Sequence, residues 1–299
     1  MATLEDSPAP VPYLGQCATS RDGGRNVVLT GAGTHCHVPK FADPISIKTV
    51  IHGEAQWRLG GQRYLIRPDT FLLLPDGDEY SLTIDSTEPS RGFNVLFRRG
   101  LVEECWRSAI ESDDALLEAP EELAPLPFAR RLESRSGRLG GALGALIEAV
   151  FAGASAATVG WMFEALGARV AESVCEQRRE RRRLTAIRHG TRLEIHRRLQ
   201  LSREAIEDDL AAPWSLETMA RAAMMAPHHF HRSFHQAFCE TPRKWLARRR
   251  AERALALLRY THSSVTEVCL LVGYTSAGSF STSFAARYGV PPSKIGRAR

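Results

Sequence analysis

Short apolar runs alternate with polar turn signals along the chain between Val27 and Phe97. Runs of this kind, bounded by Gly, Pro and Asp, are typical of β-strands. The pair Gly60-Gly61 separates the segments AQWRL and QRYLI, and two glycines in such a place indicate a two-residue hairpin. This region therefore predicts a small all-β barrel or jelly roll.

The spacing of apolar residues changes to a helical period after residue 100. Helices are predicted at 101–110, 141–153, 159–177 and 192–210, and the second and third are spaced as an antiparallel pair. A loop with Pro120, Pro125 and Pro127 separates the first two helices. The broad apolar faces favour packing on the β-rich region, on each other or on a second subunit. The run RRERRR at 178–183 is expected to be a solvated segment between domains.

Residues 264–288 have the pattern of two short helices joined by a tight turn. Apolar residues recur at helical spacing on both sides of Gly273, which lies where a sharp turn needs a residue that tolerates positive φ. Ser264 and Ser276 are expected to cap the two helices, and Phe280 and Phe284 to form the inner face of the second. The segment predicts a helix-turn-helix unit.

Residues 215–238 repeat this layout about 50 residues upstream, and an internal repeat is stronger evidence than either copy alone. Ser215 is expected to cap the first helix without a full capping box, and Pro227 to start the second, whose inner face carries Phe230 and Phe234. One helix from Thr241-Pro242 onward is predicted between the units. It would allow two recognition helices to enter successive major grooves of DNA, ~34 Å apart.

Charge is distributed unevenly over the 299 residues, whose formal net charge is +5. Residues 213–299 contain 13 Lys and Arg against 4 Asp and Glu, whereas residues 1–177 contain 16 against 24. This asymmetry indicates either a polyanionic partner for the basic half or a solvated basic surface.

The remaining composition excludes several other classes. The six cysteines are scattered without a C-x-x-C pair, which argues against a zinc knuckle or a disulfide framework. The N-terminus does not read as a signal peptide, and no stretch approaches the ~20 apolar residues of a membrane-spanning helix. We therefore expect a cytoplasmic protein that binds no membrane.

The C-terminal third resembles the AraC/XylS family of bacterial transcription regulators, over about residues 192–299. The resemblance is carried by S-L-x-x-M-A-x-x-A from Ser215, P-x-H-F-x-R-x-F from Pro227, T-P-x-x-W-L from Thr241, V-G-Y-x-S from Val272 and G-V-P-P-S from Gly289. Full-length members of that family often place a cupin-like effector-binding and dimerisation domain in front. The β-rich region and its helices resemble that arrangement more loosely.

The resemblance implies which residues meet DNA. In the first recognition helix the outward positions match His228, His231 and Arg232, and Arg232 can donate two hydrogen bonds to guanine. In the second, Ser281 and Thr282 are the candidates for base contact, but both are short, so this helix is expected mainly to touch phosphates or a thymine methyl. The expected backbone contacts are Arg243, Lys244, Arg248, Arg249, Ser276 and Ser279. Met224 stands where the family usually has Gly, which predicts a looser or strained first turn.

A small-molecule effector is expected inside the β-rich region. The candidate lining residues are His35, His37, Trp57, Arg58, Tyr64 and Tyr80. One alternative is a metal-dependent cupin enzyme fused to a DNA-binding domain, because His35-Cys36-His37 fits the start of a cupin metal motif. A later histidine is missing from that motif. The other alternative is a redox-sensing regulator that uses Cys36 or Cys105.

The sequence thus predicts an α+β multidomain regulator without catalytic residues, metal or cofactor. Its expected parts are a disordered lead-in at 1–25, a cupin-like sensor and dimerisation domain with helices at 26–177, a basic linker at 178–190 and an all-α double helix-turn-helix domain at 191–299. The expected partner is double-stranded DNA, with a small effector, RNA polymerase and a second copy of the chain as further candidates.

Overall fold

The computed structural model describes residues 3–5, 24–110, 126, 128–186, 188–261 and 263–296. The chain divides into two compact units, Met1–Arg178 and Arg179–Arg299. Most of the predicted lead-in at 1–25, and the predicted loop with Pro120, Pro125 and Pro127, lie outside the described residues.

In the described part of the N-terminal unit, eight strands form one sheet in the order β1-β2-β7-β3-β6-β8, and β4 pairs with both β5 and β7. The strands are β1 (Thr3–Glu5), β2 (Val27–Ala42), β3 (Ser46–His52), β4 (Ala55–Leu59), β5 (Gln62–Ile66), β6 (Thr70–Leu74), β7 (Glu79–Leu96) and β8 (Arg131–Ser134). All pairs are antiparallel except β1 with β2. This is the barrel-like sheet of a cupin-type domain, as the sequence predicted.

Two strands are longer than the sequence pattern indicates. The apolar runs YSLTI and GFNVLF read as separate strands, but they belong to the single 18-residue strand β7. Its first half pairs with β4 and its second half with β3, while β2 runs along the other edge. Strand β8 was also missed, because its four residues follow the proline-containing segment and carry no clear alternation.

The Gly60-Gly61 hairpin is confirmed. Both glycines have positive φ, 54° and 84°, and Leu59 pairs with Gln62 across the turn. Two positive φ values match the two-residue turn that suits the twist of antiparallel strands. The turn therefore sets the register in which Trp57 lies opposite Tyr64.

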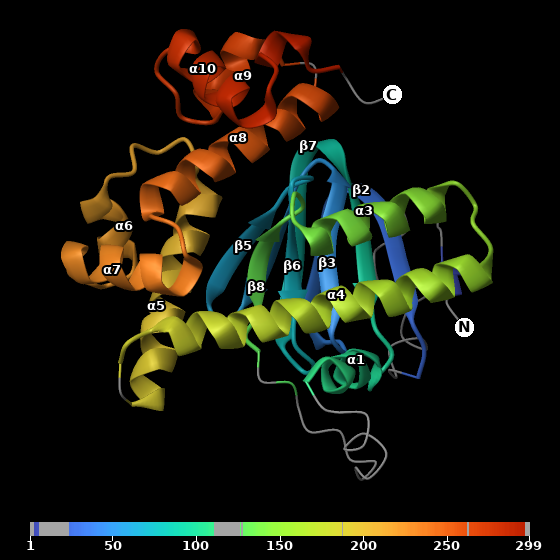
Figure 1. Cartoon of the computed structure of the whole chain (residues 1–299). Helices are drawn as coiled ribbons and strands as arrows, with labels where there is room; N and C mark the ends of the chain where they lie inside the picture. The colour runs from blue at the N-terminus through green and yellow to red at the C-terminus, as the bar shows by residue number, and fades with distance from the viewer. Residues whose placement is uncertain are drawn as a thin grey trace. The chain divides into compact units, whose positions relative to one another are not determined.

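Three described helices complete this unit: α1 (Leu101–Ile110), α3 (Arg138–Phe151) and α4 (Ala156–Arg183). Each was predicted, and α3 and α4 lie over the same face of the sheet (Figure 1). Helix α4 runs beyond Gln177 through the basic segment 178–183. That segment was expected to link two domains, but it is helical, and its Glu180 is only 3% exposed.

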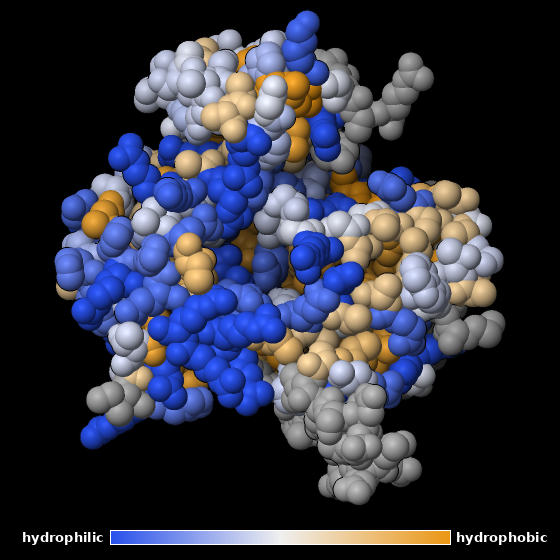
Figure 2. Space-filling model, in the orientation of Figure 1, coloured by the Kyte–Doolittle hydropathy of each residue, from blue (hydrophilic) through white to orange (hydrophobic). Residues whose placement is uncertain are grey.

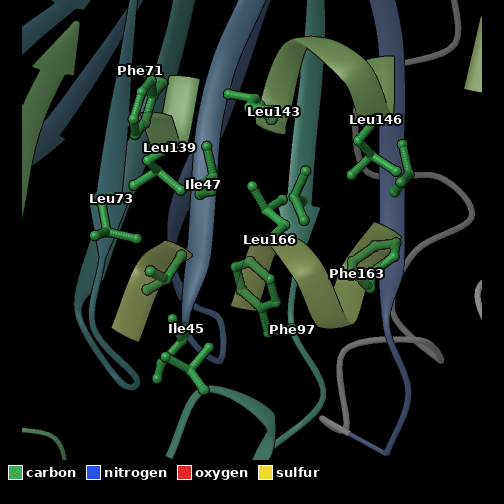
Figure 3. Packing of buried hydrophobic residues seen from close by; sticks show 14 of the residues in the cluster. Ile45, Ile47, Phe71, Leu73, Phe97, Leu139, Leu143, Leu146, Phe163 and Leu166 are labelled. Carbon is green, nitrogen blue, oxygen red and sulfur yellow. The ribbon is translucent and has the colours of Figure 1, made fainter. Parts of the chain in front are cut away.

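Alternation along the strands separates two apolar cores. Ile47, Phe71 and Leu73 point from the sheet toward α3 and α4 (Figure 3), where they meet residues such as Leu143 and Leu166. The alternate positions of the same strands face a second cluster inside the sheet. Both faces of β6 are thus buried, which explains why its sequence, TFLLL, is a continuous apolar run.

The C-terminal unit is helical in its described residues. After the end of α4 it contains α5 (His189–Asp208), α6 (Leu216–Ala222), α7 (Pro227–Phe238), α8 (Pro242–Tyr260), α9 (Val265–Leu271), α10 (Ala277–Tyr288) and the short 3-10 helix η1 (Pro292–Lys294). Helices α6 and α7 form one helix-turn-helix unit, and α9 and α10 form the other. The prediction of two units joined by one helix is confirmed.

Strongly polar side chains mark the region where α4 ends and α5 begins. Figure 2 shows hydrophilic residues gathered over the C-terminal turns of α4, whereas weakly polar and apolar residues cover α3 and the start of α4. Within this polar region, His196 Nε2 and Glu180 Oε2 form a buried contact at 2.8 Å. The hydrogen bond to His196 offsets the burial of Glu180, which is why an apparently solvated charge run contains one buried acidic side chain.

Candidate nucleic-acid interface

Helix α7 separates an apolar inner face from a polar outer face. Phe230 and Phe234 are 0% exposed and pack against each other as tilted rings, with centroids 5.5 Å apart. His228, His231 and Arg232 lie on the exposed side. Among the residues that the structure describes, Arg232 forms no ion pair. Its guanidinium is therefore free to donate to a base edge or a phosphate.

The corresponding face of α10 carries short side chains. Phe280 and Phe284 repeat the buried pair, each 1% exposed. On the outer side Thr282 is exposed and Ser281 is half-buried. Hydroxyls this close to the helix backbone cannot reach as deeply into a groove as a guanidinium does.

The N-terminus of α10 offers backbone donors instead. The Ser276 hydroxyl accepts a hydrogen bond from the Ser279 backbone N–H at 3.2 Å, so Ser276 caps the helix as predicted. Ser276, Gly278 and Ser279 are all exposed. Backbone N–H groups at a helix N-terminus favour anions such as phosphate. This geometry agrees with the predicted backbone contacts of Ser276 and Ser279 without testing them.

The four basic residues predicted on α8 fall into two groups. Arg243 and Lys244 are exposed, and within the described part of the chain neither forms an ion pair. Arg248 is half-buried, and its Nη2 donates to Glu240 Oε1 at 2.7 Å. Arg249 is 2% exposed. The prediction that Arg249 contacts the DNA backbone is therefore wrong, because its guanidinium faces the protein interior.

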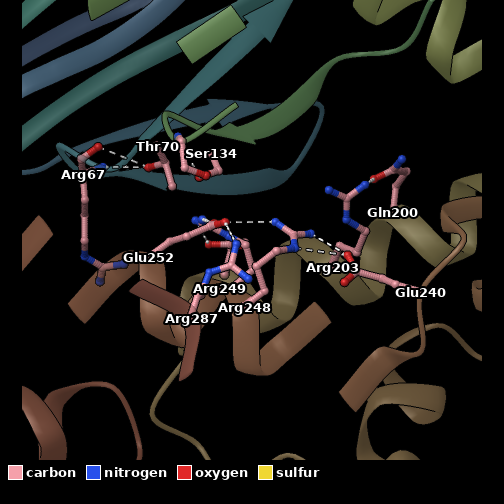
Figure 4. A network of polar contacts seen from close by, with 12 residues as sticks. Arg67, Thr70, Ser134, Gln200, Arg203, Glu240, Arg248, Arg249, Glu252 and Arg287 are labelled. Carbon is pink, nitrogen blue, oxygen red and sulfur yellow. Dashed lines mark hydrogen bonds and ion pairs between the residues drawn. The ribbon is translucent and has the colours of Figure 1, made fainter. Parts of the chain in front are cut away.

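The buried charges of α8 form a network that joins three helices (Figure 4). Arg249 donates to Glu207 of α5 and to Glu252, and Arg287 of α10 donates to the same Glu252 at 3.3 Å. Burial opposes the charge of Arg248, but its hydrogen bond to Glu240 and the nearby carboxylates raise its pKa overall. The network thus links α5, through α8, to α10, the recognition helix of the second helix-turn-helix unit. Sequence reasoning missed it, because six charged residues gave no sign of which were buried.

The turns of the two units differ in strain. Met224 in the first turn has φ 53°, a left-handed conformation that non-glycine residues rarely adopt, so the predicted strain is confirmed. Gly273 in the second turn has φ 83°. A Cβ at Gly273 would lie 2.7 Å from the Ala211 carbonyl oxygen and 2.7 Å from Arg250 Nη2. Gly273 is thus needed for the turn and also for the close approach of this turn to Ala211 and Arg250.

Both units begin with a reciprocal cap. Ser215 accepts from the Thr218 backbone N–H at 3.2 Å, and the Thr218 hydroxyl accepts from the Ser215 N–H at 2.8 Å. The expectation that Ser215 lacks a full capping box was wrong, because a threonine hydroxyl serves where Glu or Gln is usual. In the second unit the Glu267 carboxylate accepts a hydrogen bond from the Ser264 backbone N–H. This hydrogen bond, and after it the hydrogen bond with the Ser264 side chain, lowers the pKa of Glu267.

The six predicted effector residues separate into two sets. Trp57, Tyr64 and Tyr80 are at most 2% exposed and belong to the cluster inside the sheet. The other three are exposed: His35, His37 and Arg58. Because side chains alternate across a strand, these three lie on the outer face and do not line the interior. Their assignment to an interior site is wrong.

A buried polar group inside the N-terminal unit escaped the sequence reasoning. Lys48 Nζ donates to Asp43 Oδ2 at 2.6 Å, and the Tyr80 hydroxyl donates to the same oxygen. The Lys48 ammonium also lies 4.6 Å from the centroid of the Tyr80 ring. Lys48 is 2% exposed, although it lies in a strand where sequence alone would place it in solvent.

The alternatives based on metal and on thiol chemistry gain no geometric support. The described residues contain no group of three or more His, Cys, Asp or Glu side chains that could hold a metal ion. His35 instead lies 3.7 Å from Asp85, with both side chains mostly exposed. Burial, followed by the charges of Glu164 and Glu104, raises the pKa of the Cys105 thiol. This disfavours the thiolate on which cysteine reactivity depends.

None of the helices in the described part of the chain combines the length and the apolar character that crossing a membrane requires.

The architecture defines a helix-turn-helix protein with a cupin-like domain in front. A model of the AraC-like ligand binding domain matches residues 30–159, and a helix-turn-helix domain model matches residues 219–298. The chain belongs to the AraC/XylS family.

Several known proteins are similar to the chain. The transcriptional activator RhaS of Enterobacter sp. strain 638 is 33% identical over 94 residues, which cover 31% of this chain and 34% of RhaS. The virulence regulon activator VirF of Yersinia enterocolitica is 31% identical over 112 residues, or 37% of this chain and 40% of VirF. The match thus spans little more than a third of these curated relatives. The crystal structure of ToxT from Vibrio cholerae O395 has 12% identity and a TM-score of 0.36, over 89% of this chain and 96% of ToxT.

Proposed function

We propose that this protein is a sequence-specific, double-stranded DNA-binding transcription regulator. The observation that carries the proposal is the pair of capped helix-turn-helix units on the shared helix α8, with His228, His231 and Arg232 on the outer face of α7. Family membership and the basic charge of residues 213–299 support it. Catalysis has no part in this role.

In this proposal the two units divide the work. Arg232, His228 and His231 donate hydrogen bonds to base edges in one major groove. The second unit follows the next groove and holds the DNA backbone through the N-terminus of α10, while Ser281 and Thr282 make short contacts at the base edges. Arg243 and Lys244 at the start of α8 supply further phosphate contacts.

The test is retention of duplex DNA by the full chain over a series of salt concentrations. Because displaced counterions set the slope, log Kd should change linearly with log salt, with a slope of about 0.9 for each phosphate contact. A random-sequence duplex serves as the control for specificity. Absence of binding at low salt would contradict the proposal. So would equal binding to the random-sequence duplex and to duplexes that the chain selects from a random DNA pool.

The N-terminal unit is proposed to sense a small effector. The match of residues 30–159 to a ligand-binding domain supports this role, and so does the aromatic interior with Trp57, Tyr64 and Tyr80. An effector changes regulation only if it binds one state of the protein better than the other. A ligand screen by thermal shift, followed by calorimetry on the full chain and on Trp57→Ala, tests the assignment. A ligand that binds both forms equally would place the site elsewhere.

Further partners follow from regulation. Both curated relatives are named as activators, which supports RNA polymerase as a partner. A second copy of the chain is also proposed, because Trp161 on α4 is 70% exposed. A cytoplasmic location would give access to DNA. Analytical ultracentrifugation of the full chain and of Trp161→Ala checks the dimer: a monomeric parent chain would contradict it, and equal dimer fractions would show that Trp161 is not at the interface.

A further inference from the structure

A cavity of about 710 Å³ lies between the two helix-turn-helix units of the C-terminal unit. Its walls come from the start of α6, the outer side of α7, the first half of α8, and the turn and recognition helix of the second unit. Figure 1 shows α8 running from the α6–α7 pair to the α9–α10 pair. Its size falls within the range of ~300–1,000 Å³ that is typical of small-molecule sites.

The floor of the cavity is apolar and its sides are aromatic. Met219 and Leu246 are 3% and 6% exposed and line the floor with Leu216. Trp214 and Tyr274 stand on the sides. The Trp214 indole N–H donates to the Asp209 carbonyl at 2.7 Å, and the Tyr274 hydroxyl lies 3.0 Å from the Ser283 hydroxyl. These hydrogen bonds orient both rings, and the Tyr274 ring also packs on Phe280, with ring centroids 5.4 Å apart.

The rim of the same cavity is cationic. Arg243, Arg250 and His231 all line it. Arg250 Nε and Nη2 donate to the carbonyls of Leu210 and Ala212 at 2.9 and 2.8 Å, which fixes the guanidinium beside the opening. The guanidinium lies 5.9 Å from the Tyr274 ring centroid. Two of its five N–H groups are used in this way, so others remain to meet an anion.

We propose that this cavity binds a small planar aromatic anion, such as an aryl carboxylate or sulfonate. The ring would pack against Trp214, Tyr274 and the apolar floor, and the acid group would meet Arg243 and Arg250. The site is separate from the proposed effector site in the N-terminal unit. All residues that line it belong to the C-terminal unit, Arg179–Arg299.

Occupation of the site would also affect DNA binding, and this part rests on the proposed function. His231 is a proposed base contact and Arg243 a proposed phosphate contact, and both line the rim. An anion bound there would occupy the cationic side chain of Arg243, which a DNA phosphate would otherwise contact. The ligand therefore competes with DNA, and by linkage DNA weakens the ligand to the same extent.

The experiment uses the fluorescent probe anilinonaphthalene sulfonate with the full chain. Ala247 lines the cavity and is exposed on α8, so its substitution does not disturb the core. Ala247→Glu places a carboxylate between Arg243 and Arg250 and should weaken probe binding about ten-fold, whereas Ala247→Lys should not weaken it. Arg243→Gln should weaken it about five-fold. Ala286→Glu, on an exposed position of α10 outside the cavity, should leave it unchanged.

A saturating amount of duplex DNA should displace the probe from the parent chain. If Ala247→Glu and Arg243→Gln bind the probe as the parent does, the cavity is not the binding site and the inference fails. If these variants lose the probe but duplex DNA does not displace it, the competition is wrong. A chain that binds the probe as expected but never retains duplex DNA would overturn the proposed function and leave the cavity assignment intact.

Discussion

The two helix-turn-helix units share one backbone plan but differ in the surface that each presents. Each has a reciprocally capped first helix and a second helix built on two buried phenylalanines. The first unit has a strained turn at Met224 and long polar side chains on its outer face. The second has a relaxed glycine turn and short side chains outside. A repeated fold can therefore keep its core while its two copies take different parts in recognition.

The difference depends on how the two units are held together. Glu252 of α8 contacts both Arg249, which reaches α5, and Arg287 of the second recognition helix. Gly273 lies against Ala211, in the loop between α5 and α6. Such contacts fix the spacing between the recognition helices, which the proposed division between base reading and backbone contact requires.

Removal of the charge of Glu252 should have the largest effect. Glu252→Gln removes the buried carboxylate that Arg248, Arg249 and Arg287 share, which should lower the free energy of unfolding by roughly 3–5 kcal/mol, although Arg249 keeps its contact with Glu207. Urea unfolding of the full chain, followed by the loss of helical structure, measures the change. Glu240→Gln is the matched control, since Glu240 pairs with the half-buried Arg248 and its loss should cost less than about 1 kcal/mol. Equal losses in the two variants would contradict the role of the network.

The turns should respond in opposite directions. Gly273→Ala should destabilise the fold by roughly 2–4 kcal/mol, because φ is positive and the new methyl group meets the Ala211 carbonyl. Met224→Gly should stabilise it by about 0.5–1 kcal/mol, because glycine adopts the left-handed conformation without strain. Urea midpoints of the two variants check both signs. A destabilised Met224→Gly would show that the first turn is not strained.

Base reading should be concentrated in the first unit. Arg232→Ala should weaken binding to the selected DNA sequence by roughly 1–3 kcal/mol and relax one base position. Thr282→Ala, at an outer position of α10, should change affinity by less than about 0.5 kcal/mol. Titrations with the selected duplex and with single-base variants measure both. Equal losses would remove the distinction between the units.

The basic residues at the start of α8 should act on all sequences alike. Arg243→Ala should reduce the salt slope of DNA binding by about 0.9 without changing base preference. Arg248→Ala should leave the slope almost unchanged, since its guanidinium is engaged by Glu240 and Glu252. The slope of log Kd against log salt for each variant gives the answer. A larger change for Arg248 would show that its ion pairs open on DNA.

The smallest effect concerns the two caps. The pKa of Glu267 is lowered, so its stabilising contribution is present above the usual carboxyl pKa and is lost as pH falls through the lowered value. The cap of the first unit uses the hydroxyl of Thr218, which does not titrate in this range. The protection factor of the Ser264 amide, which is its intrinsic exchange rate relative to the observed rate at the same pH, should therefore fall on acidification, while that of the Ser215 amide should not. A protection factor at Ser264 that does not change with pH would contradict the Glu267 cap.

Local signals in the sequence predicted much of the fold. Gly60-Gly61, the serines at the helix starts and the paired phenylalanines each depend on neighbouring residues alone, and each behaved as expected. Long-range pairing was less accessible, and so the continuous strand β7 and the short strand β8 were not recognised.

The candidate site divides in the same way. Exposure of Arg232 follows from helical periodicity. Burial of Arg249 does not, because it depends on Glu207, which lies 42 residues away in the sequence. Likewise, the outward direction of His35 depends on the register of β2 against β7, which residue types do not reveal.

Selection of bound duplexes from a random DNA pool tests most directly whether the first unit reads bases and the second holds the backbone. The parent chain should select one strongly defined half-site next to a weakly defined one, about one helical turn away. Arg232→Ala should erase a position in the strong half, and a Ser281→Ala, Thr282→Ala double variant should leave the selected sequence nearly intact. Two equally defined halves, or a sequence unchanged by Arg232→Ala, would contradict this division between the units.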